Sequence, residues 1–275
     1  MEYDPLSPTK GRSIGRGRLA EVFAWGDDQA IKLFYPGRPR KLIENEAYIS
    51  QIAHGSGLNT PAVGEVVEVD GRHGIVFELV EGTSMLSQIG GKPWLLVRYA
   101  RILAEQQAHM HGQKATHMPA QRELLAQSIR SADALSTEQK ESGISAAEEL
   151  PDGDAICHGD FHPDNVIISR RGAITIDWTT ASRGNPLADV ARTSLLLRLG
   201  ELPPGTPAMM RGLVAAGRGL FHRTYLKRYF ELRPGSREKL SAWQFPIVCV
   251  RLGDGIVEEY AQLLALLADG TTPES

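Results

Sequence analysis

The chain has 275 residues, a formal net charge of -3 at pH 7 and only two cysteines. Its 42% hydrophobic and 23% charged content is ordinary for a globular protein and excludes extended disorder. The near-neutral charge gives no general attraction to nucleic acid or membranes, and two cysteines are too few for a disulfide framework. The sequence shows neither a signal-like start nor an apolar run of about 20 residues. We therefore expect a cytoplasmic protein without nucleic-acid or membrane partners.

The first 80 residues predict a small sheet that carries one helix. The segments EVFAW and QAIKLF are rich in strand-forming residues and flank the turn GDD, so residues 11–35 should contain a hairpin. Apolar residues at helical spacing predict an amphipathic helix over residues 41–53. The segment EVVEVDGRHGIVFELV then predicts two strands joined by a turn at residues 70–74.

From Pro93 onward the pattern becomes mostly helical, with one or two polar helices expected over residues 119–150. A compact β segment interrupts the helices, because NVIIS, RRG and AITID predict strand, tight turn and strand. The sequence thus predicts an α+β protein with two lobes. Residues 1–80 would form an N-terminal lobe with a small antiparallel sheet and one helix, and residues 81–275 a mostly helical C-terminal lobe.

The segment HGDFHPDN, residues 158–165, carries the most informative polar residues. Asp160 and Asn165 share one loop before a buried strand, and Asp177 ends the strand predicted to pair with it. A hairpin would bring Asp177 back beside Asn165, and such an oxygen-only pair suits Mg²⁺. Asp160 would then lie close to the metal, where it could accept a proton from a substrate hydroxyl.

A zinc hydrolase is the competing interpretation of this segment, because His158, Asp160 and His162 recur at every second position. On a strand this spacing could give one metal-binding face. Pro163 breaks such a strand, however, and no second cluster supplies the remaining ligands. The sequence therefore favours the magnesium interpretation.

HGDFHPDN followed by ITIDW resembles the catalytic loop and metal-binding aspartate of the protein-kinase-like superfamily, in its aminoglycoside phosphotransferase and choline kinase branch. The resemblance implies that Asp160 is the catalytic base and that Asn165 and Asp177 hold Mg²⁺ on the nucleotide. It implies that Asp189, in GNPLADVA, braces the catalytic loop. His158 would be a structural residue of that loop.

The resemblance also implies a two-lobed protein-kinase-like fold, with residues 1–80 as the nucleotide-binding lobe and residues 81–275 as the catalytic and substrate-binding lobe. The expected nucleotide is ATP, with GTP not excluded. GRGRLAEV matches a glycine-rich phosphate loop except that Ala20 replaces the third glycine. The glycines would allow positive φ and a close approach of the backbone to phosphate. A strand lysine would reach the phosphates and pair with Glu46, or with Glu44 as the less favoured alternative. The implied nucleotide-binding residues are Gly15, Gly17, Val22, Ala30, Lys32, Glu46, Glu78 and Val80, the last two through backbone groups at the hinge.

A small-molecule hydroxyl is the expected acceptor, because Asp189 follows Asp177 too closely for a segment that could hold a peptide. His162, Asp254 and Glu258 are candidate acceptor-binding residues. Asp254 and Glu258 are expected one turn apart on the last helix, where they could bind a cationic acceptor. A choline-type acceptor would need an aromatic cage, for which the candidates are Trp178, Tyr225, Tyr229, Trp243 and Tyr260. The alternatives are a nucleotide-binding pseudokinase or regulatory module, and a protein kinase without an activation loop. The sequence leaves the acceptor and the oligomeric state open.

Overall fold

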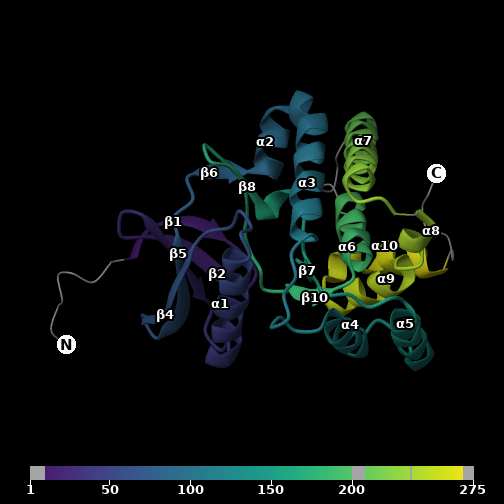
Figure 1. The fold of residues 1–275 in the computed structure, drawn as a ribbon, viewed down its shortest axis with the longest axis horizontal. Coiled ribbons are helices and arrows are strands. Elements are labelled where there is room, and N and C mark those ends of the chain that lie inside the picture. The colour runs from purple at the N-terminus through teal and green to yellow at the C-terminus, as the bar shows by residue number, and fades with distance from the viewer. Residues whose placement is uncertain (1–9, 200–207, 236, 269–275) are drawn as a thin grey trace. The chain divides into compact units, whose positions relative to one another are not determined.

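The structure is a computed structural model that describes residues 10–199, 208–235 and 237–268 (Figure 1). Its contacts divide the chain into two compact units. The first unit comprises Met1–Thr83 and Ile167–Thr179, and the second comprises Ser84–Val166 and Thr180–Ser275. The segment 167–179 therefore packs with the N-terminal residues, although more than eighty residues of the second unit precede it in the chain.

A five-stranded antiparallel sheet with strand order β1-β2-β3-β5-β4 forms most of the first unit. Its strands are β1 (Lys10–Arg16), β2 (Ala20–Trp25), β3 (Gln29–Phe34), β4 (Val63–Val69) and β5 (Arg72–Glu78). The single helix α1 (Arg40–Gly55) lies against β4 and β5, and it extends slightly beyond the predicted residues 41–53. The predicted small antiparallel sheet with one helix is confirmed.

The turn between β4 and β5 shows how local sequence fixes the strand register. Asp70 and Gly71 form this two-residue connection, and both have positive φ values, of 52° and 71°. A turn with two positive φ values matches the twist of a hairpin, and Asp followed by Gly is a favoured sequence for it. Val69 consequently pairs with Arg72, and the alternating side chains of β4 keep a fixed face toward α1.

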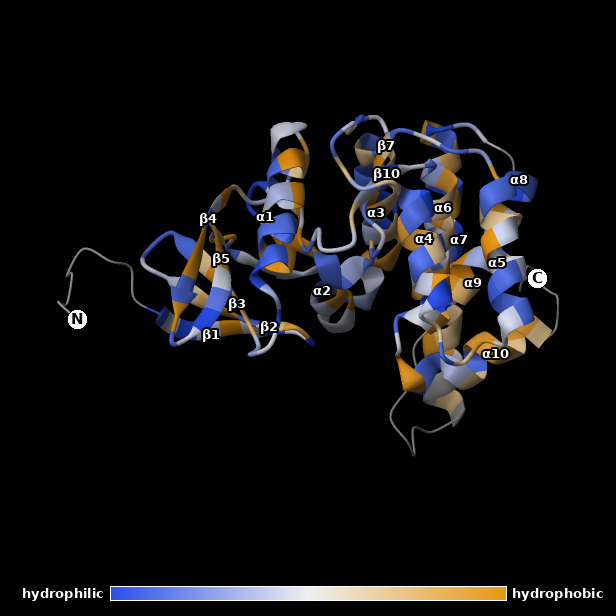
Figure 2. Cartoon of the chain, turned by 90° about the horizontal axis from the view of Figure 1, so that it is seen from below, coloured by the Kyte–Doolittle hydropathy of each residue, from blue (hydrophilic) through white to orange (hydrophobic). Residues whose placement is uncertain are grey.

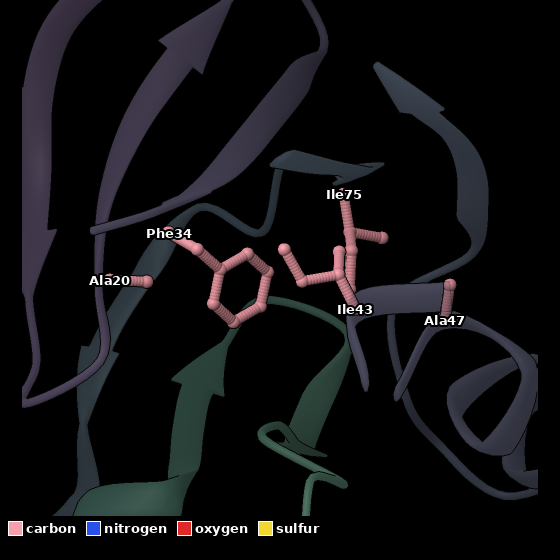
Figure 3. Packing of buried hydrophobic residues seen from close by; sticks show 5 residues of the cluster. All are labelled: Ala20, Phe34, Ile43, Ala47 and Ile75. Atoms are coloured by element: carbon pink, nitrogen blue, oxygen red, sulfur yellow. The ribbon is translucent and has the colours of Figure 1, made fainter. Parts of the chain in front are cut away.

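The core between the sheet and α1 is a cluster of small and large apolar side chains: Ala20, Phe34, Ile43, Ala47 and Ile75 (Figure 3). All five are at most 4% exposed. The ring of Phe34 points from the end of β3 toward Ile43 on α1 (Figure 3). Burial of a side chain such as Phe34 or Ile43 stabilises a fold by about 1.5–3 kcal/mol, so this cluster anchors α1 to the sheet.

A second sheet of three strands has the order β6-β8-β9, with β6 at Gly82–Ser84, β8 at Val166–Ser169 and β9 at Gly172–Thr175. The strand, tight turn and strand predicted for NVIIS, RRG and AITID are thus confirmed. The expectation that Asp177 ends the second strand is wrong, because β9 ends at Thr175 and Asp177 follows it. Gly82 is needed at the pairing with β8, because a Cβ atom there would lie 2.5 Å from the carbonyl oxygen of Ile168.

The second unit is mostly helical. Its helices are α2 (Met85–Gly91), η1 (Pro93–Leu95), α3 (Leu96–Met110), α4 (Gln121–Arg130), α5 (Thr137–Glu149), η2 (Pro163–Asn165), α6 (Pro186–Arg198), α7 (Ala208–Leu232), α8 (Arg237–Ser241), α9 (Gln244–Gly253), η3 (Val257–Glu259) and α10 (Tyr260–Ala268). Two short strands, β7 (Ala155–Cys157) and β10 (Ser182–Gly184), pair within it. The predicted mostly helical C-terminal region is confirmed, and so are the two polar helices over residues 119–150.

Helix α6 is central to this unit, since it packs against α7, α8 and α9 and is buried over most of its length. It begins where the sequence predicts a helix start. The side chain of Asn185 accepts a hydrogen bond from the Leu187 N–H, and Pro186 occupies the first helical position. Figure 2 shows the contrast between the mostly apolar α10 and the more polar α5. In the described part of the chain, every helix is too short or too polar to cross a lipid bilayer.

Candidate active site

The first unit contains a pocket of about 180 Å³ that this unit alone lines. Val22 and Ala30 form part of its apolar wall, together with Phe77 and with Ile167 on β8 and Ile176 after β9. Its polar lining residues are Lys32, Glu46, Ser50, Thr60, Glu78 and Asp177. An apolar slot with a few convergent polar groups is typical of a small-molecule site. Six of the eight residues predicted for nucleotide binding line it: Val22, Ala30, Lys32, Glu46, Glu78 and Val80. Gly15 and Gly17 are not among its lining residues.

Lys32, in the middle of β3, is held between two carboxylates. Its Nζ lies 2.6 Å from Oε1 of Glu46 on α1 and 2.8 Å from Oδ1 of Asp177. The hydroxyl of Thr179 lies 3.3 Å away. Burial by itself lowers the pKa of Lys32, but the charges and hydrogen bonds of Asp177 and Glu46 outweigh it and raise that pKa. Lys32 is therefore a fixed cation at the pocket.

Glu46, and not Glu44, is the helix residue that lies against Lys32. The Glu46 side chain is 3% exposed, whereas Glu44 forms an exposed ion pair with Arg40 one turn earlier on α1. Arg38 lies 3.9 Å from the second Glu46 oxygen, Oε2, which has no hydrogen-bond donor among the described residues. The buried Glu46 carboxylate thus depends mainly on Lys32 for its counter-charge.

Asp177 has an unusual backbone conformation, with a φ of 64°. Asp tolerates this left-handed region better than most residues do. The next residue anchors the segment, because the buried Trp178 donates a hydrogen bond of 2.9 Å from Nε1 to the Thr60 hydroxyl. The Thr179 hydroxyl donates to Asp177 Oδ1 at 2.6 Å. These contacts hold the Asp177 carboxylate at the pocket, with the side chain 42% exposed.

The glycine-rich segment forms the connection between β1 and β2, where the Gly17 N–H donates to the Ala20 carbonyl at 2.8 Å. The expectation that its glycines adopt positive φ is wrong for both Gly15 and Gly17. Pairing with Val22 explains this for Gly15, because a paired strand needs extended backbone, although the register shifts between Ser13 and Gly15. Ala20 stands at the third glycine position because its methyl group belongs to the apolar core beside Phe34.

At the predicted hinge, the backbone N–H groups of Glu78 and Leu79 are bonded within the first unit, to the carbonyls of Ala62 and Asp28. Val80 forms no hydrogen bond with any other residue that the structure describes. The Glu78 side chain accepts a bond from the Ala62 N–H at 3.2 Å and pairs with Arg171 at 2.6 Å. Its side chain therefore ties the hinge to β4 and to the turn between β8 and β9.

In the second unit, the catalytic-loop motif follows β7 and turns at Gly159. Gly159 has a φ of 78°, and a Cβ atom there would lie 2.6 Å from the Thr180 carbonyl oxygen. Both facts require glycine at this position. The Thr180 hydroxyl donates to the His158 carbonyl at 3.0 Å, and the Asp160 N–H donates to His158 Nδ1 at 3.3 Å. His158 is fully buried and lies within the loop's own hydrogen bonds.

Asp189, near the start of α6, accepts hydrogen bonds from the two backbone N–H groups that precede Asp160. The His158 N–H lies 3.1 Å from Oδ2, and the Gly159 N–H lies 2.7 Å from Oδ1. Gln107 on α3 and His111, which directly follows this helix, also contact Oδ2, at 3.0 and 3.1 Å. Burial raises the pKa of Asp189, but His111, Gln107 and the Gly159 N–H outweigh it and lower that pKa to about 2.

The Asp160 carboxylate is partly exposed and lies between two basic side chains. His162 Nε2 is 3.6 Å from Oδ2, and Arg192 Nη2 is 4.0 Å from Oδ1. Burial raises the pKa of Asp160, but the hydrogen bond and charge of His162 and the charge of Arg192 hold it well below its ordinary value. The Asn165 amide donates to the Asp160 carbonyl at 2.9 Å and lies 3.3 Å from His162 Nε2.

The predicted acceptor-binding acids occupy different elements. Asp254 follows α9, where Gly255 with a φ of 70° turns the chain, and Glu258 lies in η3. The expectation that both acids share the last helix is therefore wrong, because α10 begins only at Tyr260. Asp254 accepts hydrogen bonds from both Arg192 and Arg251, whereas Glu258 is exposed.

Sequence reasoning missed Arg192. It follows Asp189 by three residues and therefore shares a face of α6 with it. Because Asp189 was expected to contact the catalytic loop, this spacing could have indicated that Arg192 also faces it.

The alternating histidines of HGDFH do not form a metal cluster. Among the described residues, the side chains that come close enough together to hold a metal ion are His111, Cys157 and Asp189, whose potential ligand atoms lie within 4.8 Å of one another. His111 and Asp189 already hydrogen-bond to each other in this group, and burial raises the pKa of the Cys157 thiol well above its ordinary value. The zinc-hydrolase interpretation gains no support from this arrangement.

Comparison with known proteins agrees with this geometry. A sequence profile of the phosphotransferase enzyme family matches residues 10–234. No significant match was found among curated protein sequences.

Three solved structures illustrate the similarity of fold. A thermostable mutant of aminoglycoside phosphotransferase APH(4)-Ia, in a ternary complex with AMP-PNP and hygromycin B, is 15% identical, with 94% of this chain and 91% of that chain covered and a TM-score of 0.62. An aminoglycoside-3'-phosphotransferase of type VIII is 21% identical, with coverages of 87% and 93% and a TM-score of 0.56. A choline/ethanolamine kinase family protein from Mesorhizobium loti is 16% identical, with coverages of 98% and 82% and a TM-score of 0.57.

The small antiparallel sheet with one helix, the mostly helical second unit and these structural neighbours define a protein-kinase-like fold. Because the profile matches most of the chain, the protein belongs to the phosphotransferase enzyme family.

Proposed function

We propose that the protein transfers the γ-phosphate of ATP to a hydroxyl group of a small molecule. The observation that carries this proposal is the arrangement of Lys32 between Glu46 and Asp177 at the pocket of the first unit. Burying the charges of a lysine and its carboxylates costs desolvation free energy. A ligand of the lysine would explain why these charges are kept, and phosphate is a ligand that such a lysine neutralises.

The pocket residues fit a nucleotide. The apolar side chains of Val22, Ala30 and Phe77 can cover a flat ring, and the hinge offers the Glu78 carbonyl and the Val80 N–H to its edge. Lys32 would contact the α and β phosphates. The Arg171 ion pair fixes the Glu78 backbone in place, so the hinge is organised before the ligand binds.

Asp177 and Asn165 are the proposed Mg²⁺ ligands, because both offer the hard oxygen atoms that this ion prefers. Mg²⁺, when bound, would neutralise charge on the phosphates. Lys32 would release Asp177 from the ion pair that the two residues form, and would keep Glu46 as its partner. Glu46 is suited to this role because its carboxylate is buried and has no comparably close second cation.

Asp160 is the proposed base. Its low pKa keeps it ionised at neutral pH, so it can accept a hydrogen bond from the acceptor hydroxyl and orient that oxygen toward the γ-phosphorus. The hydroxyl proton would pass to the carboxylate as the bond to phosphorus forms and the bond to the leaving ADP oxygen breaks. A weakly basic carboxylate serves this purpose when the proton leaves late, as in a loose phosphoryl-transfer transition state.

The charges and aromatic groups predicted for acceptor binding disfavour two acceptor classes. Asp254 already pairs with two arginines, so it offers little attraction to a polycation. Four of the five candidates for an aromatic cage are at most 3% exposed: Trp178, Tyr225, Tyr229 and Trp243. A quaternary ammonium could not stack on side chains buried in this way. We therefore favour a neutral or weakly charged acceptor, such as a sugar or another polyhydroxyl compound.

The test is ADP release from the purified protein with ATP and Mg²⁺ across a panel of aminoglycosides, macrolides, choline, ethanolamine, amino sugars, neutral sugars and homoserine. Asp160→Asn and the matched surface variant Asp154→Asn are measured beside the wild type. We expect release that one neutral acceptor stimulates and that only Asp160→Asn abolishes. Equal turnover in both variants would remove Asp160 as the base, and stimulation by choline alone would contradict the favoured acceptor class.

A further inference from the structure

Arg192 is a buried cation next to the proposed base. It projects from α6 with 7% of its side chain exposed, and its Nη2 lies 4.0 Å from Asp160 Oδ1 while hydrogen-bonding to Asp254. Its Nε and Nη1 atoms are also buried, and neither has an acceptor among the described residues. A guanidinium with unsatisfied buried N–H groups costs stability, so stability alone gives no reason for an arginine here.

A series of alternating charges fixes the far side of Arg192. Asp254 Oδ2 also accepts a hydrogen bond of 3.1 Å from Arg251 Nη1. Arg251 in turn binds both oxygens of Glu259, at 2.6 and 2.7 Å. This bidentate pair is the strong, directional kind that a guanidinium forms with a carboxylate. Asp254 therefore has a fixed position at the end of α9, and it holds the Arg192 guanidinium.

The near side of Arg192 faces a carboxylate that is not bonded to it. A separation of 4.0 Å is too long for a hydrogen bond, but it is short enough for a strong attraction between opposite charges. His162 lies at the other oxygen of Asp160, at 3.6 Å. The two oxygens of Asp160 are thus each turned toward one basic group, and Oδ1 keeps a lone pair for a substrate hydroxyl.

We propose that Arg192 is a positioning residue that fixes the orientation of the Asp160 carboxylate, and that Asp254 holds Arg192 for this purpose. This inference rests on the proposed role of Asp160 as the base. It assigns Asp254 to the catalytic loop and not to the acceptor. In this arrangement the guanidinium orients the Asp160 carboxylate by charge attraction and leaves Oδ1 free to accept a hydrogen bond from the substrate hydroxyl.

The kinetic test compares Arg192→Met, Arg192→Lys and Asp254→Asn with the control Arg228→Met. Arg228 pairs with Glu105 and Glu231 in the same unit but contacts no residue of the catalytic loop. ADP release is measured with ATP, Mg²⁺ and the best acceptor of the panel, or with water alone. We expect Arg192→Met to lower kcat at least tenfold with the KM for ATP within twofold, Arg192→Lys to recover part of the loss, and the control to stay within twofold.

A double-mutant cycle tests the contact without any activity. Urea unfolding midpoints are measured for wild type, Asp160→Asn, Arg192→Met and the double variant. We expect the change in midpoint caused by Arg192→Met to be less favourable in the wild-type background than in the Asp160→Asn background, because the attraction is already lost in the latter. If Arg192→Met does not fold, Arg192→Lys takes its place in the cycle.

The outcomes separate the two hypotheses. Unchanged kcat in Asp160→Asn would refute the proposed function. A large loss in Asp160→Asn with none in Arg192→Met would overturn the inference alone. Strictly additive urea midpoints would also overturn it, and non-additive midpoints would support it even if no acceptor stimulated ADP release.

Discussion

Replacing Asp189 by Asn should show how much the negative charge of Asp189, as distinct from its size, contributes to stability. Asn has the same size, but one of its two terminal atoms donates hydrogen bonds. If the Asn oxygen faces His158, Gln107 and His111, its amide group meets the Gly159 N–H. That N–H is then left without an acceptor, which costs about 1–3 kcal/mol.

The pKa of Asp189 gives a second estimate of the loss in free energy of unfolding. Lowering this pKa from 3.8 to about 2 corresponds to about 2 kcal/mol of stabilisation of the folded state at neutral pH. Because the folded-state pKa is the lower one, this contribution is present above pH 4 and is lost as the pH falls toward 2. Both estimates predict that Asp189→Asn lowers the free energy of unfolding at pH 7 by about 1–3 kcal/mol.

Urea unfolding at pH 7 and at about pH 3, followed by circular dichroism, measures both effects. We expect the difference between wild type and Asp189→Asn to shrink at the lower pH. Asp154→Asn is the matched control, because Asp154 forms an exposed ion pair with Lys114 and should be nearly neutral. A variant as stable as the wild type at pH 7, or a difference that did not depend on pH, would refute the assignment of Asp189 as an ionised brace of the loop.

Three further predictions concern other residues of the site. Lys32→Met should abolish ADP release and destabilise the fold by about 3–5 kcal/mol, because it leaves Glu46 buried without its partner. A second change, Glu46→Gln, should restore thermal stability but not activity. Recovery of both would contradict a role of Lys32 at the phosphates. Gly159→Ala should lower kcat and the melting temperature together, since the new methyl group would meet the Thr180 carbonyl at 2.6 Å; wild-type values for both would show that the loop does not need this turn. Ala20→Gly should cost about 1–2 kcal/mol in urea unfolding through the lost core methyl group and the freer strand backbone, with the KM for ATP unchanged; a lower KM would instead place Ala20 at the phosphates.

Much of the fold could be predicted from local patterns. Alternation along EVVEV and the Asp70–Gly71 turn fix a hairpin by themselves, because a turn with two positive φ values sets the register of both strands. Helix α6 likewise begins at an Asn cap followed by Pro. Such signals depend on neighbouring residues and are therefore visible in the sequence.

The predicted catalytic motif could be recognised in the sequence for a different reason. Phosphoryl transfer needs a carboxylate base and oxygen ligands in a fixed order, and Asp160, Asn165 and Asp177 lie within eighteen positions around one hairpin. Their roles stay predictions, which the variants above will test. What the sequence could not indicate was the conformation of the glycine-rich segment, because Gly15 pairs with Val22 in a strand and Ala20 belongs to the core.

By itself, the sequence determined the elements, their order and the chemical types of the site residues, since these depend on periodicity, turn chemistry and short spacing. Only the tertiary structure decided which charges meet. Glu46 lies against Lys32 while Glu44 faces solvent, and Asp254 pairs with Arg192, which lies sixty-two positions earlier in the chain. An ion pair depends on the distance between its charged groups and on their burial in the folded chain. The rotation of each helix and the path of each loop determine this distance and burial, and no local sequence pattern indicates them.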